Sequence, residues 1–144
     1  MDTLTRKKIQ ALDGPALSRL AYTLGLAPPG TVMDREVDHR NEHGTPAVWM
    51  LHHWDTWEPH KRLDQADAVF RLLREHGWMT SVYWWAGFYG QGGEVIAERQ
   101  YHGQDFLWQF RHVNDEEAFA LLLVAVLAMC SQRSVSLQAL SEKE

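Results

Sequence analysis

The apolar run over residues 118–130 limits how this chain can fold more than any other feature of its sequence. A helix-start signal precedes it, because Asn114 is a good N-cap residue and Glu117 stands three positions later. The run predicts a helix that is apolar almost all round, and such a helix must be covered on every side. Either the sheet and the N-terminal helices of the same chain cover it, or a second subunit does. We therefore expect burial inside the domain or a homodimer through residues 115–129.

Length and charge narrow the class of protein. A chain of 144 residues with 45% hydrophobic and 23% charged residues has the size and composition of one globular domain. We expect a single α/β sandwich domain over residues 1–130 and a polar tail over 131–144. The net charge of −5 disfavours general binding to nucleic acids or anionic membranes. The apolar run is shorter than the roughly 20 residues that a bilayer span needs, and the first residues contain no apolar signal segment. We therefore expect a cytoplasmic protein with no membrane partner.

Three further helices are indicated by the spacing of apolar residues. Residues 4–12 and 15–24 form two short N-terminal pieces, of which the second opens on a proline and is closed by Gly25. The segment 63–76 carries an apolar stripe on one side and charged residues on the other, and Gly77 is suited to end it.

Three strands follow the middle helix, at about 78–86, 94–101 and 106–112, and the first two are separated by a glycine-rich turn over 87–93. They predict an antiparallel three-strand meander. Upstream, the sequence fits a β-hairpin whose turn lies at 41–44, with 47–51 as its stronger strand, and a loop in place of its first strand is the alternative.

The alternation of side chains along these strands predicts how the sheet is covered. Phe106, Trp108 and Phe110 share one face of the last strand, as in a half-buried strand. The first strand is bulky on both faces, with Val82 and Trp84 opposite Met79, Tyr83 and Trp85. A strand bulky on both sides is usually covered on both sides. We therefore expect an α+β fold in which helices cover both faces of a small antiparallel sheet, an α/β/α sandwich.

This order of elements resembles the phage ABA-sandwich domain family, small proteins of bacteriophages and prophages that carry no established general function. The resemblance lies in residues 9–17 with the leucine-rich helix after them, in Trp57-Glu58-Pro59, in the helix 67–78 and in the closing helix 117–129. His60-Lys61-Arg62-Leu63-Asp64 stands where the family often has a short Ser/Thr-Asp element. The resemblance implies a phage or prophage origin, with the host cytoplasm as location, and carries over no catalytic residue.

Residues 34–60 are the one region whose composition suits a metal ion, because they are rich in histidine and carboxylates. Their spacing matches no metal-ligand motif, and the adjacent His52 and His53 would face opposite sides of a strand. We predict that His39, His43, His52 and His53 do not converge, and that the protein holds no metal or other cofactor. The alternative is an enzyme or a small-ligand-binding protein that uses this region.

Other catalytic signals are weak. Cys130 lies among apolar residues, which raise the pKa of a thiol and leave it unreactive. Serines such as Ser18 and Ser81 lie in no nucleophile elbow. The glycines at 90–93 lead into a strand rather than a helix, so they predict a hairpin turn and not a phosphate loop.

The seven tryptophans suggest how the chain could act without catalysis. We expect Trp78, Trp84 and Trp108 to lie in the core. Trp54 and Trp57 flank a turn, and Phe88 and Tyr89 lie in a glycine-rich turn. We take these four as candidate binding residues, because exposed aromatics in rigid turns anchor protein partners. Capping of the core edges explains them equally well. The sequence thus favours a protein-binding domain that contacts a host protein or a second copy of itself.

Overall fold

The computed structural model describes residues 3–28, 31–33, 46–50, 53–87, 90–101, 103–113 and 116–142. The helices in this part of the chain are α1 (Thr3–Gln10), α2 (Gly14–Thr23), α3 (Leu63–Glu75) and α4 (Glu117–Glu142). The main antiparallel sheet has the order β4 (Met79–Gly87), β5 (Gly90–Tyr101), β6 (Gln104–Val113). A smaller antiparallel sheet has the order β1 (Val32–Met33), β2 (Pro46–Met50), β3 (His53–Thr56).

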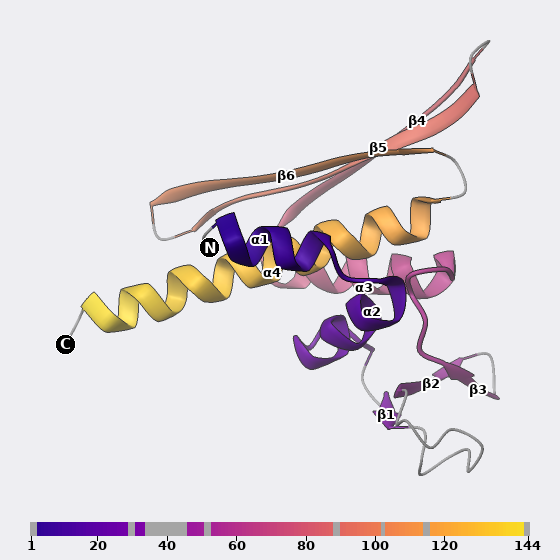
Figure 1. Ribbon diagram of the computed structural model, residues 1–144, viewed down its shortest axis with the longest axis horizontal. Helices are drawn as coiled ribbons and strands as arrows, with labels where there is room; N and C mark the ends of the chain where they lie inside the picture. Colours follow the sequence, from indigo (N-terminus) through magenta and orange to yellow (C-terminus); the bar gives the residue numbers. More distant parts are fainter. Residues whose placement is uncertain are drawn as a thin grey trace.

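The elements are arranged in layers around α4 (Figure 1). The main sheet lies along one side of α4, and α1, α2 and α3 contact α4 from other sides. The smaller sheet lies at the far end of the molecule from the main sheet. The predicted α+β class and the three-strand meander are confirmed.

The closing helix is buried by its own chain. Every residue from 120 to 129 is at most 4% exposed. Strands β5 and β6 contact α4 on the sheet side, and α2 and α3 supply most of the contacts on the other. The alternative of burial inside the domain is therefore the one the structure shows, and the reason for expecting a homodimer through residues 115–129 no longer holds.

The helix boundaries follow the local signals in the sequence. The Asp13 carboxylate caps α2 by accepting a hydrogen bond from the Ala16 N–H at 2.8 Å, and a proline stands in the first turn. Gly25 and Gly77 end α2 and α3 with φ angles of +81° and +93°, which favour glycine. The expected proline at the start of α2 and the expected helix ends at Gly25 and Gly77 are confirmed. The Asp13 cap was not predicted, and the expected N-cap Asn114 lies outside the described residues.

The segment 131–144, expected to form a polar tail, is helical as far as Glu142, because α4 continues through it. A tryptophan of β6 and one directly before β4 hold the first polar residues of this extension. Trp108 Nε1 donates to Ser131 Oγ at 3.1 Å, and Trp78 Nε1 donates to Gln132 Oε1 at 2.8 Å. Polar side chains that have partners of this kind can continue a buried helix.

The hairpin in the smaller sheet also differs from the expectation. Strand β2 pairs with the segment after it, β3, with Trp49 opposite Trp54. Only two positions separate β2 from β3 in the sequence, and so short a connection favours antiparallel pairing of the two segments. The prediction of a turn at 41–44 did not take this connection into account. The other neighbour of β2 is β1, and the expected turn lies outside the described residues.

The expectation that helices cover both faces of the main sheet is wrong. The four helices of the described residues lie on one side of it (Figure 1), and Met79, Tyr83 and Trp85 on the other face are 67%, 58% and 48% exposed. The alternation of side chains placed these residues on the correct face. The alternation could not show whether helices cover that face, because this depends on where the helices pack, and they pack around α4.

Shortening a leucine of α4 tests the buried helix. Leu122 is 0% exposed, so Leu122→Ala should lower the free energy of unfolding by about 2–5 kcal/mol, measured by urea denaturation. The matched control is Leu107→Ala, because Leu107 is 54% exposed and its truncation should change stability by no more than about 0.5 kcal/mol. Equal effects of the two substitutions would contradict the burial of Leu122 against the rest of the chain.

Candidate functional site

The surface of the main sheet that faces away from the helices, called the outer face below, is built from alternate residues of its three strands. Cross-strand pairing aligns them in rows, which include Met79–Glu98–Leu107, Ser81–Ile96–Gln109, Tyr83–Glu94–Arg111 and Trp85–Gly92–Val113. The opposite residues, among them Val95, Ala97 and Phe110, point toward α4. The strict alternation of a strand therefore places every second residue of the sheet on one open surface.

The outer face is unusually apolar for a surface. Leu107 and Val113 are each 54% exposed, in addition to the three exposed residues of β4. Monomeric soluble proteins rarely expose contiguous apolar patches of more than a few hundred Å², and larger ones mark contacts with other molecules. Tyrosine and tryptophan are also the residues most enriched at the centres of protein interfaces.

Charged residues on the outer face are mostly acidic. The Arg111 guanidinium pairs with the Glu94 carboxylate at 2.9 Å, so these two charges offset each other within the sheet. Glu98 and Asp105 are exposed on the same face. The face therefore combines apolar side chains with a net negative charge.

Of the four residues predicted to anchor a partner, Trp57 is buried rather than exposed. Its side chain is 1% exposed, and its Nε1 donates to the Ser18 carbonyl oxygen at 3.0 Å. Trp57 therefore joins the core rather than an exposed anchor, because its indole spans the space between α2 and the segment before α3. The side chain of Trp54, and Phe88 and Tyr89 altogether, lie outside the described residues.

The three tryptophans expected in the core have different surroundings. Trp78 is 3% exposed, which confirms the expectation for this residue. Trp108 is half-buried, and the Arg6 guanidinium lies 5.0 Å from the centre of its ring. For Trp84 the expectation is wrong, because this side chain is 65% exposed at the start of α4.

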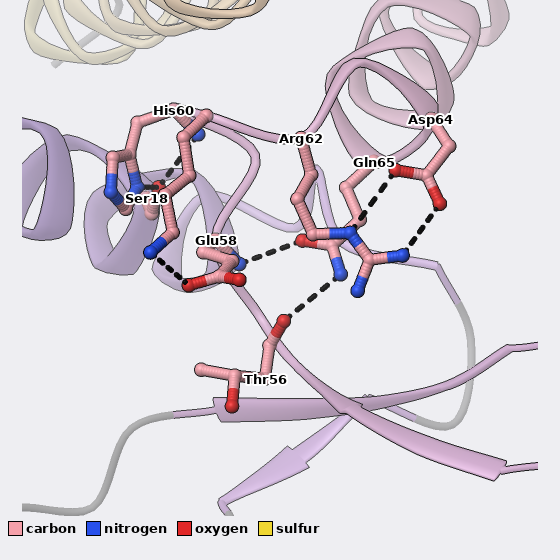
Figure 2. A network of polar contacts seen from close by, with 8 residues as sticks. Ser18, Thr56, Glu58, His60, Arg62, Asp64 and Gln65 are labelled. Carbon is pink, nitrogen blue, oxygen red and sulfur yellow. Dashed lines mark hydrogen bonds and ion pairs between the residues drawn. The ribbon is translucent and has the colours of Figure 1, made fainter.

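A polar cluster connects α2 to the segment before α3 (Figure 2). Ser18 Oγ and His60 Nδ1 share a hydrogen bond of 2.8 Å, and Ser18 Oγ also accepts one from the His60 N–H at 3.3 Å. The fully buried Gln65 accepts from the Glu58 N–H at 2.7 Å and donates to the Thr56 carbonyl at 2.9 Å. A cavity of about 230 Å³ lies beside this cluster, lined in part by Arg19, His60 and Lys61.

The serine–histidine pair has the composition of a nucleophile and a base, but its geometry is structural. Ser18 is 2% exposed within a helix, so a substrate cannot reach its hydroxyl group. The Glu58 carboxylate is held by Lys61 at 3.1 Å. Burial lowers the pKa of His60, while the nearby Glu58 carboxylate opposes that shift. The pair therefore fixes the chain before α3 against α2.

The structure bears on the metal prediction only in part. Within the described residues, no three His, Cys, Asp or Glu side chains are grouped to hold a metal ion. The side chains of His39, His43, His52 and His53 lie outside the described part, so their failure to converge stays a prediction. Cys130 is partly buried, and burial raises the pKa of its thiol, as its sequence neighbours indicated.

Comparison with protein-family models, with curated proteins and with solved structures finds no match for the chain. In the described part of the chain, no helix has both the length and the apolarity to cross a membrane.

Removing the Ser18 hydroxyl tests the structural role of the polar cluster. Ser18→Ala leaves two polar groups of His60 without their partner, and it should lower the free energy of unfolding by about 1–3 kcal/mol in urea denaturation. The control is Thr23→Ala on the same helix, where the exposed hydroxyl donates to the Arg19 carbonyl of its own helix and the change should stay within about 0.5 kcal/mol. A stable Ser18→Ala variant would contradict this role.

The stability of the fold should also depend on pH through His60. Because burial lowers the pKa of folded His60, the unfolded chain binds its proton more readily, and folding stability falls as pH drops below the ordinary histidine pKa of about 6.5. His60→Gln removes this contribution. Denaturation measured between about pH 7 and pH 5 should show a shallower loss of stability for the variant than for the wild type. An unchanged slope would show that His60 does not contribute.

Proposed function

We propose that this protein is a small interaction domain without catalytic activity, and that it binds a partner protein on the outer face of the main sheet. The observation that carries the proposal is the group of exposed apolar side chains on a hydrogen-bonded antiparallel sheet, with Tyr83 and Trp85 at 58% and 48% exposure. Side chains held by a sheet lose little conformational freedom on binding, which favours affinity.

The charge of the outer face indicates the chemistry of the partner. Glu98 and Asp105 remain exposed beside the apolar residues, and the whole chain carries a net charge of −5. A second copy of this chain would bring the same acidic face against them. The partner we propose is therefore a different protein, with an apolar contact surface flanked by lysine or arginine residues.

The biological setting is part of the proposal. The resemblance to phage ABA-sandwich proteins supports a phage or prophage protein that acts in the host cytoplasm. A small acidic domain with an open sheet face is suited to docking on a basic surface of a host machine and modulating it. A role of this kind needs no cofactor.

Site-specific crosslinking tests the outer face. A photo-crosslinking amino acid at position 107 should capture a partner in bacterial lysate, whereas the same group at position 61, whose lysine side chain is 63% exposed before α3, should not. The double substitution Tyr83→Ser and Trp85→Ser should abolish the capture, with circular dichroism confirming the fold. High salt should weaken it, because the proposed partner is basic.

Two results would overturn the proposal. One is capture that is equal at positions 61 and 107, or that survives the double substitution. The other is crosslinking of the chain to itself at position 107, which would identify the outer face as a contact between copies.

A further inference from the structure

A cavity of about 380 Å³ lies on the other side of strand β4 from the outer face. Residues of α3, of β4 and of the start of α4 line it. Its apolar part consists of Leu63, Val82, Trp84 and Leu121. Leu63 and Trp84 are 48% and 65% exposed, so this apolar surface is open to solvent.

The Trp84 side chain is fixed at this cavity. Its Nε1 donates to Glu117 Oε1 at 2.6 Å, which ties the indole to the first turn of α4. Trp84 pairs across the strands with Gly93, which has no side chain to cover the ring. The indole therefore combines high exposure with a set orientation, an arrangement suited to stacking against a ligand.

The ionisable residues that line the cavity are all carboxylates: Asp64, Asp67 and Glu117. Arg62 pairs with Asp64 at 2.9 Å, which Figure 2 shows, and Arg71 pairs with Asp67 at 3.0 Å. Both ion pairs are solvent-exposed, and such pairs contribute little in water, so their carboxylates can also receive a second cation. Glu117 adds a negative charge whose hydrogen bond is to a neutral indole.

We propose that this cavity binds a basic side chain, arginine or lysine, of the partner protein. Its aliphatic stem would lie along Leu63, Val82 and Leu121, and its charged end would meet the carboxylates and the face of Trp84. The source of the side chain rests on the proposed function, whereas the site itself consists of this chain's own residues. An apolar floor with an acidic rim matches a long apolar stem that ends in a cation.

The position of β4 connects this site with the outer face. Trp84 and Trp85 are consecutive residues of an edge strand, so their side chains point to opposite sides of the sheet. A partner that covers the outer face at Trp85 needs only to pass around this edge to place a basic residue beside Trp84. The two surfaces together define a partner that wraps β4.

Binding of a single amino-acid derivative tests the site without the partner. N-acetyl-arginine amide should shift the indole N–H signal of Trp84 in NMR spectra with a Kd of about a millimolar, the range expected for a ligand of this size. N-acetyl-citrulline amide, which has the same shape without the charge, should bind at least about tenfold more weakly. High salt should weaken the binding of the arginine derivative but not that of the citrulline derivative.

A pair of double substitutions with identical charge changes locates the binding. Asp67→Asn with Glu117→Gln should weaken binding of N-acetyl-arginine amide about tenfold. Asp105→Asn with Glu98→Gln, on the outer face, should leave it unchanged. No shift of the Trp84 signal, equal binding of the citrulline derivative, or equal effects of the two double substitutions would overturn the site. Failure of the crosslinking experiment alone would leave the site standing and remove only its assignment to a partner protein.

Discussion

The fold depends on covering one helix on all sides. From residue 120 to 129, α4 has no polar side chain, and every residue of this segment is nearly inaccessible to solvent. Burial of this apolar surface is a large favourable contribution to folding. Strands β5 and β6 cover one side of the helix, and α2 and α3 cover most of the rest. The other helices and the main sheet of the chain therefore pack around α4.

This arrangement leaves the main sheet with one uncovered face. A sheet of this kind has one surface for α4 and another that needs either polar residues or a covering layer. The helices are on the α4 side, yet β4 and β6 still present Tyr83, Trp85, Leu107 and Val113 outward. Aromatic and aliphatic side chains that remain this exposed contribute less to the stability of the isolated chain than buried ones do. The contact with another molecule that we propose would account for their presence.

Local signals in the sequence were sufficient to predict the helices and strands, but not which of their surfaces are buried. Helix ends at Gly25 and Gly77, the α+β class and the inward face of β6 could be predicted, because each depends on neighbouring residues or on strand alternation. The burial of Trp57 depends on a carbonyl in α2, 39 positions away in sequence. The exposure of Trp84 depends on the position of the first turn of α4 relative to β4. Such contacts between distant segments leave no periodic signal in a single sequence.

The glycines of β5, the central strand, allow aromatic rings to pack closely against the main sheet. The sequence suggested a turn there, but Gly92 and Gly93 pair within the strand. A Cβ atom at Gly92 would lie 2.9 Å from the ring of Trp85, and one at Gly93 would lie 2.7 Å from Nε2 of His112. Rings therefore pack directly on the backbone from both sides of the sheet. The contact with Gly92 restricts Trp85 on the outer face, and the hydrogen bond to Glu117 restricts Trp84 on the other. In the interaction that we propose, ordering these two indoles would therefore cost less conformational entropy.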